Sequence, residues 1–300
     1  MRFRIAAALA TVYVVWGSTY LGIAVAIRTM PPLLMLAARF LVAGALLYPW
    51  ARRRATARPT LGQWRHAALT GGLLLLGGTG GVAIAEQSID SGVVALLVAA
   101  MPLWLALFDR KPLGARALAG LALGFGGVAL LVSPGAGGFK LGALVVMVGT
   151  VCWALGSLAS RRASHTEPLL GNAMQMLAGG ALLVGAGLVH GEAGHLEAPS
   201  FASLGALAYL VVVGSLVGFT AYTWLLRHAR TSLVGTYAYA NPIVAVLLGF
   251  LFLGEPLTWT TLVAGAVIVA GVALIVAAPG ERYSRAREVV RPAFGQAQVR

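Results

Sequence analysis

Long apolar stretches recur from one end of this chain to the other, separated by short polar segments. A helix needs roughly 17 to 25 mostly apolar residues to cross a hydrocarbon core about 30 Å thick. Ten stretches meet this length. We therefore expect ten transmembrane helices, near residues 5–26, 31–50, 67–87, 91–108, 115–133, 139–159, 168–189, 203–226, 231–253 and 258–278.

The overall composition agrees with a membrane protein. The chain is 59% hydrophobic and 10% charged, whereas soluble domains carry about 25% charged residues. A net charge of +13 would suggest a nucleic-acid partner for a soluble protein. Here the basic residues fall in the short segments between apolar stretches, so we expect the lipid bilayer as partner and no nucleic acid. The single cysteine, Cys152, excludes an internal disulfide framework.

The distribution of basic residues predicts the orientation of the chain. With ten spans, both termini lie on one side, and 19 of the 22 Lys and Arg residues fall on that side. Only Arg28 and Lys140 fall on the other side, and Arg39 lies inside a span. Because basic loops stay in the cytoplasm, we expect both termini to be cytoplasmic.

An internal repeat divides the sequence into two halves. Residues 32–47 and 168–183 share nine identities in sixteen positions. Trp16 and Trp153 correspond at nearly the same offset. Since each copy holds five spans, an odd number, the second copy enters the membrane from the opposite face. Inverted repeats of this kind are typical of secondary transporters, whose substrate site lies near the midplane.

The predicted fold is therefore an all-α membrane protein with ten transmembrane helices arranged as two inverted five-helix repeats. The first repeat spans residues 5–133 and the second spans residues 139–278. The remaining residues, 279–300, are polar and basic, and we expect them to form a cytoplasmic tail near anionic headgroups.

Four short motifs make a family recognisable: Trp16-Gly-Ser-Thr-Tyr20, Ala85-Glu86, Tyr237-Ala-Tyr-Ala-Asn-Pro242 and Gly254-Glu255-Pro-Leu257. With these motifs the chain resembles the EamA-domain carriers of the drug/metabolite transporter superfamily, and most closely their YedA-like bacterial inner-membrane branch. The resemblance covers roughly residues 5 to 278. It implies ten helices, a central cavity between the halves, and export of small metabolites such as amino acids or related compounds.

Arg39 is the basic residue expected deepest in the membrane. It lies eight residues past Pro31, about 12 Å along the second span. An ionised Arg at that depth costs at least ~2.5 kcal/mol, so it should face the bundle interior or a watery cavity. It is either an anchor for a substrate carboxylate or phosphate, or an interior Arg bonded to backbone carbonyls. Its counterpart in the second repeat is the polar Gln175.

Glu86 is the acidic residue that we place inside a span, at the outer end of the third helix. Intramembrane carboxylates often mark proton relays. Three roles are open: accepting a proton during transport, pairing with Arg39, or lying in interfacial water. The first role would couple transport to protons.

Polar and aromatic residues in mid-span positions complete the predicted substrate site. Spacing places Tyr13, Trp16 and Tyr20 on one helical face, and Tyr237 and Asn241 on another. Aromatic residues near helix ends usually mark the membrane interface. The residues named here lie in mid-span, so an interfacial role explains them less well. With Arg39, the predicted substrate-binding set is Trp16, Ser18, Thr19, Tyr20, Met101, Trp153, Tyr237 and Asn241.

Pro102 and Pro242 occupy matching positions in the two repeats. Each removes a backbone donor and opens its helix locally. The kinks could act as hinges for alternating access, expose carbonyls to a solute, or be static.

Two other motifs do not indicate a site. Gly77-Gly-Thr-Gly-Gly81 resembles a phosphate loop, but no Lys follows in the required position. His190, Glu192, His195 and Glu197 are metal-ligand types in a Gly- and Ala-rich loop, for which we expect a solvated loop. We therefore expect no metal and no cofactor.

The sequence thus favours a secondary transporter that exports a small-molecule solute by alternating access, and not an enzyme. A lipid-linked sugar flippase or a nucleotide-sugar or organophosphate carrier on the same scaffold remains an alternative. An intramembrane enzyme is disfavoured because the spans carry no HExxH motif and no Ser/His/Asp set. A channel remains open, although an inverted repeat favours a carrier.

Overall fold

The computed structural model describes residues 2–108, 114–132, 141–162, 167–229 and 236–277. Within these ranges the secondary structure is entirely helical. The elements, in chain order, are α1 (Arg2–Ala26), α2 (Pro32–Arg54), α3 (Leu61–Gly71), η1 (Gly72–Gly80), α4 (Gly81–Ala85), α5 (Ser91–Val98), α6 (Met101–Phe108), α7 (Ala115–Val132), α8 (Leu141–Arg162), α9 (Pro168–Val189), η3 (Glu192–His195), α10 (Phe201–Tyr209), η4 (Leu210–Val217), α11 (Gly218–His228), α13 (Tyr237–Leu248), η5 (Gly249–Leu253) and α14 (Trp259–Ala277).

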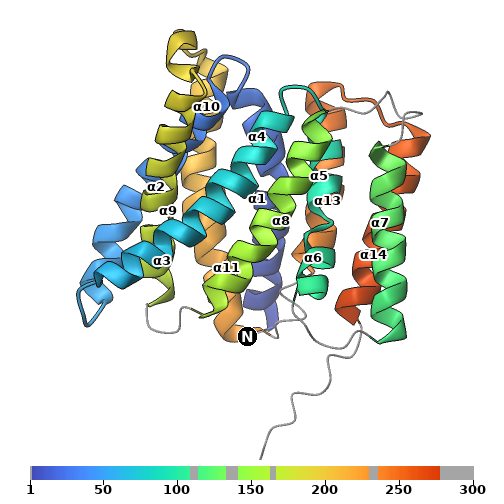
Figure 1. Ribbon diagram of the computed structural model, residues 1–300, viewed down its shortest axis with the longest axis horizontal. Helices are drawn as coiled ribbons and strands as arrows, with labels where there is room; N and C mark the ends of the chain where they lie inside the picture. Colours follow the sequence, from blue (N-terminus) through green and yellow to red (C-terminus); the bar gives the residue numbers. More distant parts are fainter. Residues whose placement is uncertain (1, 109–113, 133–140, 163–166, 230–235, 278–300) are drawn as a thin grey trace, which may run out of the picture.

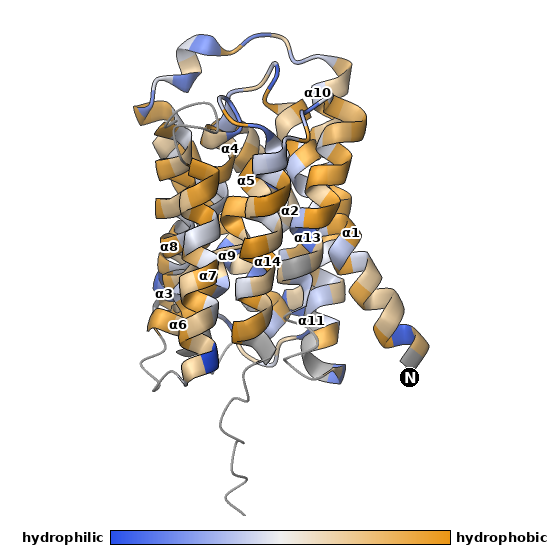
Figure 2. Ribbon diagram, turned by 90° about the vertical axis from the view of Figure 1, so that its right-hand side faces the viewer, coloured by the Kyte–Doolittle hydropathy of each residue, from blue (hydrophilic) through white to orange (hydrophobic). Residues whose placement is uncertain are grey.

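Eight of the resulting helices are long and apolar enough to cross a membrane, and two shorter apolar helices follow at Ala240–Leu253 and Trp259–Ile275. The prediction of an all-helical membrane protein is therefore confirmed. The shorter pair falls within the predicted ninth and tenth spans, whose adjoining residues 230–235 and 278 lie outside the described ranges. Figure 2 shows the apolar residues along the helices, with more hydrophilic residues toward both ends of the bundle.

Local sequence signals explain where several helices begin. Pro32 and Pro168 occupy the first turns of α2 and α9, where a missing backbone donor costs nothing. Thr60 precedes α3 and forms a capping box with Gln63, each side chain bonding to the other residue's backbone N–H. This third helix consequently begins at Leu61, six residues earlier than the predicted start at 67.

Helices from the first half of the sequence pack against helices from the second half throughout the bundle (Figure 1). At one edge α7 lies beside α14, and at the opposite edge α2 and α3 lie beside α9. Between these edges α1 packs against α13, and α8 packs against η1 and α6. Most of the described core residues form a single buried cluster that extends across these helices.

Two of the long helices widen into π-helical segments near their middles. The segment η1 interrupts the helix that runs from α3 to α4, and η4 interrupts the helix from α10 to α11. A π-helical segment disturbs the regular i to i−4 hydrogen bonding, and such segments occur frequently at functional sites. The segment η4 borders the candidate site described next.

Candidate functional site

Arg39 lies in the interior of the bundle, as its position in an apolar span predicts. It belongs to α2 and is 5% exposed. Its Nε donates a hydrogen bond of 3.0 Å to the Oγ of Ser215 in η4. The hydroxyl that it contacts therefore comes from the π-helical segment of the other half of the chain.

Two further polar side chains extend this site toward α1. The Ser18 hydroxyl donates to the carbonyl of Val15 at 2.9 Å and lies 2.5 Å from the Tyr209 hydroxyl. Tyr209 in turn lies near Arg39 and directly precedes η4, the segment that carries Ser215. We call Arg39, Ser215, Ser18 and Tyr209 the Arg39 cluster; it joins α1, α2, α10 and η4.

Gly214 allows the helices to approach closely at this cluster. A Cβ atom at Gly214 would lie 3.1 Å from Nη2 of Arg39 and 3.2 Å from Cγ2 of Thr19. Both distances are shorter than ordinary van der Waals contact. The predicted residues Thr19 and Arg39 thus meet at a glycine, while the Thr19 hydroxyl donates to the carbonyl of Trp16.

An aromatic group lies beside the Arg39 cluster, toward the N-terminal end of α1. The Trp16 ring centroid is 4.9 Å from that of Tyr222, 5.2 Å from that of Tyr237 and 5.7 Å from that of Phe219. These tilted and edge-on contacts are the geometries that aromatic rings favour. The structure therefore brings Trp16 and Tyr237 together, as part of a larger group than predicted.

Asn241 connects α1 to α13 near this aromatic group. It is 9% exposed. Its side-chain amide satisfies its surroundings in the orientation in which the nitrogen donates to the carbonyl oxygens of Tyr13 at 3.3 Å and Tyr237 at 3.2 Å. These backbone contacts give Asn241 a role in helix packing, while the hypothesis that it binds substrate stays a prediction.

Three of the predicted residues lie in other surroundings. Trp153 in α8 packs against Gly78 of η1, where an added Cβ would lie 3.2 Å from the ring. Met101 is buried at the start of α6. Tyr20 is also buried and lies near Glu86. The predicted set therefore does not form a single group.

Glu86 follows the last residue of α4 and is enclosed by protein. Both carboxyl oxygens are buried, and within the described residues neither has a hydrogen-bond partner. Among the described residues Glu86 thus makes no hydrogen bond to Arg39, and the three roles considered for it stay predictions. A buried carboxyl group without hydrogen bonds is costly when ionised, so proton binding is the role that this environment favours.

The two predicted kink prolines differ in their setting. Pro102 is the second residue of α6, after a break that separates α6 from α5. Pro242 lies inside α13. Pro102 thus interrupts its span more sharply than Pro242 does, although both lie between apolar segments.

One expectation for the loop after α9 is wrong. Glu192 is not solvated but 4% exposed, because it accepts hydrogen bonds from the backbone at the start of α2. His190 lies 3.9 Å from the same carboxylate. His195 and Glu197 are exposed, as expected.

Sequence reasoning did not find Ser215 and Tyr209, which complete the Arg39 cluster. Ser215 is 176 residues from Arg39, and Tyr209 is 191 residues from Ser18. In an apolar stretch a single Ser is often a small residue at a helix contact. The polar character of Ser215 within a span could have indicated a role in the site, but this indication is weak because a Ser hydroxyl can also bond to the backbone of its own helix.

The fold and this buried polar site define the protein as a polytopic helical membrane protein with an enclosed cationic group. Comparison with known sequences identifies the family. The chain belongs to the EamA-like transporter family, whose sequence profile matches residues 4–133 and 140–277. It is therefore a membrane transporter of this family, as its motifs predicted.

Individual relatives support the assignment along the whole chain. The inner membrane transporter YedA of Escherichia coli, described as uncharacterized, is 38% identical over 99% of each chain. The transporter YvbV of Bacillus subtilis, described in the same way, is 27% identical over 91% of each chain. A solved crystal structure with 22% identity covers 92% of this chain and 98% of its own, with a TM-score of 0.62, and supports the fold alone.

Proposed function

We propose that this protein is a secondary transporter that exports small metabolites with a carboxylate group, such as amino acids or related compounds, by alternating access. Arg39 carries this proposal. Among the described residues it is the one buried basic side chain, and it contacts a neutral hydroxyl there. A cation in an apolar bundle is costly unless a negative group compensates it, and a carboxylate of the solute would supply that charge.

The presence of one cation at this site favours a solute group with a single negative charge over a phosphate ester. Phosphate carries up to two charges and several acceptor oxygens, and it is usually held by more than one cation or by a helix N-terminus. Arg39 with Ser215 and Tyr209 offers one guanidinium and two hydroxyls. We therefore rank a lipid-linked sugar or nucleotide-sugar solute below a carboxylate.

Alternating access needs two units that can move against each other, and we infer that these are the inverted halves 5–133 and 139–278. Helix packing supports this inference. The contact of α2 with η4 has its counterpart in the contact of α9 with η1, and α1 meets α13 as α8 meets α6. The contacts of α2 with α9 and of α7 with α14 would lie on the symmetry axis.

In the proposed arrangement ten helices cross the membrane and both termini are cytoplasmic. The substrate cavity lies between the halves, bordered by the Arg39 cluster and the aromatic rings around Trp16. Glu86 binds the proton that couples to transport, and Pro102 and Pro242 permit bending. The distribution of Lys and Arg supports the orientation.

Counterflow in proteoliposomes tests this function. Vesicles loaded with a mixture of amino acids and other small carboxylates should take up a labelled member of the mixture with saturable kinetics. Comparing the media of overexpressing and deletion strains identifies which solute to label. Conductance that does not saturate with solute concentration would contradict a carrier.

A further inference from the structure

Two loop glutamates of the second half reach helices of the first half. Glu192 follows α9 in the chain, and its carboxylate lies at the start of α2. Its Oε1 accepts from the backbone N–H of Leu33 at 3.1 Å, and its Oε2 accepts from that of Leu34 at 2.9 Å. Glu192 thus binds the first turn of α2 with both oxygens.

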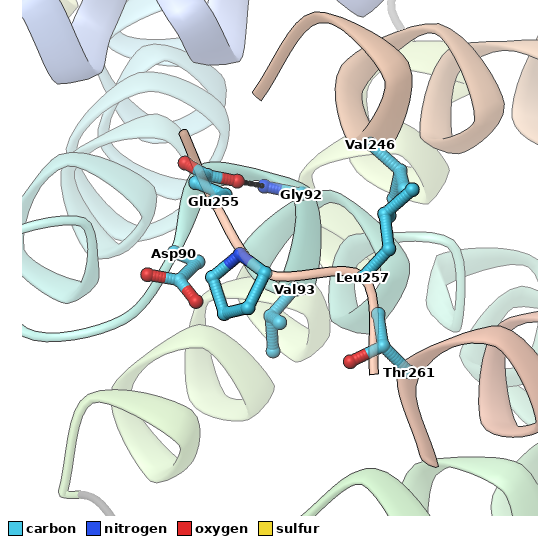
Figure 3. A pocket seen from close by; sticks show the side chains of 8 residues that line it. Asp90, Gly92, Val93, Val246, Glu255, Leu257 and Thr261 are labelled. Atoms are coloured by element: carbon cyan, nitrogen blue, oxygen red, sulfur yellow. Dashed lines mark hydrogen bonds between the residues drawn. The ribbon is translucent and has the colours of Figure 1, made fainter. Parts of the chain in front are cut away.

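Glu255 makes the equivalent contact with α5. Its Oε1 accepts from the backbone N–H and from the hydroxyl of Ser91, both at 2.7 Å, and its Oε2 accepts from the N–H of Gly92 at 2.9 Å. Figure 3 shows this carboxylate at the start of α5, with the bond to Gly92 dashed. Glu255 lies in the segment between η5 and α14.

Helix starts are suited to such contacts. The first four N–H groups of a helix have no partner within it, and its dipole favours negative charge there. Hydrogen bonds from such groups to a carboxylate are charge-assisted and stronger than neutral ones. The N-cap residues that α2 and α5 themselves provide, Pro31 and Asp90, make no side-chain capping bond. Each helix start is therefore completed by a carboxylate from the other half.

The Glu255 carboxylate occupies a fitted position. On one side it borders Gly249 of η5, where a Cβ atom would overlap the carboxylate. On another it borders Gly92, where a Cβ would lie 3.3 Å from Oε2. Asp90 lines the same small recess, and Glu86 interacts with Glu255 electrostatically. The start of α5 supplies the hydrogen bonds that hold the Glu255 carboxylate beside these acids.

Both contacts lie at the same end of the bundle. The starts of α2 and α5 follow the ends of α1 and α4, and the two glutamates follow α9 and η5. In the proposed orientation this end faces away from the cytoplasm. On this face the two carboxylates thus join the halves, together with the hydrogen bonds of Thr29 to Ser200 and Ser203 at the start of α10.

We propose that Glu192 and Glu255 form a two-point latch that holds the outer face closed, and that opening to the outside requires both carboxylates to leave the helix starts. This inference rests on the proposed alternating-access function. The latch acts on the equilibrium between closed and open forms, so its removal exposes the interior even when no solute is present.

Cysteine accessibility tests the latch. Cys152 is replaced by Ala, and Thr19→Cys is introduced as a reporter beside Arg39. A membrane-impermeant thiol reagent is then added to the outside of intact cells. We expect Glu255→Gln and Glu192→Gln each to raise the labelling rate about tenfold, because the amide lacks the negative charge and offers one accepting oxygen in place of two. The exposed Glu197 in the same loop as Glu192 gives a matched control, Glu197→Gln, which should leave the rate unchanged.

A second variant displaces Glu255 without removing its charge. Gly249→Ala places a methyl group where the carboxylate lies and should raise labelling as Glu255→Gln does. Gly205→Ala is the control, because an added Cβ there meets nothing within 4 Å. Each variant is compared only after it elutes as a single species in detergent.

Unchanged labelling in Glu255→Gln, Glu192→Gln and Gly249→Ala would overturn the latch. Faster labelling in only one of the two glutamate variants would overturn its two-point form. The assay uses no solute, so failure to find transported solutes would remove the proposed function and leave the labelling result intact. Conversely, saturable counterflow with unchanged labelling would remove the latch alone.

Discussion

The indole of Trp16 lies directly against Gly218, where an added Cβ would fall 2.6 Å from the indole nitrogen. The other half of the chain repeats this relationship, since Trp153 lies against Gly78 at 3.2 Å. The tryptophans correspond in the repeat, and the two glycines are separated by 140 residues, the same spacing as Pro102 and Pro242. Gly78 lies within the π-helical segment η1, and Gly218 directly follows the π-helical segment η4.

The contact between Trp16 and Gly218 gives the first prediction. Gly218→Ala should move the Trp16 ring away from α11 and disturb its contacts with Tyr222 and Phe219. We expect overpacking to cost about 1 to 3 kcal/mol and counterflow to fall about tenfold. Gly205→Ala, whose added methyl group contacts nothing, is the control. Equal counterflow in the two variants would show that the position of Trp16 is unimportant.

Arg39 gives the second prediction. Arg39→Gln removes the charge that we assign to the solute carboxylate, so the KM for an anionic solute should rise about tenfold or more, from the loss of ~1.5 to 3 kcal/mol. Arg39→Lys should restore part of the affinity because it restores the charge but not the planar fork. Counterflow kinetics of both variants measure this. If Arg39→Gln and Arg39→Lys weaken transport equally, the Arg39 side chain is needed for its shape and not for its charge.

Much of the fold could be predicted because the membrane imposes simple rules. Apolar length predicted the helices, and the cost of an ionised group in hydrocarbon predicted that Arg39 is buried. The start of the third helix was misplaced because Thr60 and Gln63 form a capping box within a polar stretch. Hydropathy alone does not detect such a start.

The partners within the site were less predictable. Ser215 and Tyr209 reach the site from a helix that is widened at η4, and this widening changes which residues face the interior. Glu192 was misread because a Gly- and Ala-rich loop suggests solvent exposure, whereas its carboxylate binds α2. Both errors concern contacts between distant segments, which single-sequence patterns do not encode.

Glu86 gives a third prediction. Its buried carboxyl has no hydrogen-bond partner among the described residues. Because an ionised carboxylate is costly in such a place, we expect Glu86 to bind a proton during the transport cycle. Glu86→Gln mimics the protonated form, and transport by this variant should lose most of its dependence on pH. Initial counterflow rates over a series of pH values measure the effect. Glu197→Gln should keep the pH profile of the parent protein. A Glu86→Gln profile that is also unchanged would exclude coupling through this residue.

The crossing of α7 and α14 gives the last prediction, which concerns stability. These helices approach so closely that a Cβ at Gly120 would lie 2.7 Å from both the Gly271 carbonyl oxygen and Cγ1 of Ile275. Small residues let membrane helices pack in this way. Gly120→Ala should therefore separate the helices and lower the melting temperature in detergent by several degrees, whereas Gly126→Ala on the same helix, with nothing within 4 Å of its Cβ, should not. Thermal unfolding followed by size-exclusion chromatography compares the two variants. Equal melting temperatures would mean that the crossing adjusts without cost, and that close packing of α7 on α14 does not stabilise the bundle.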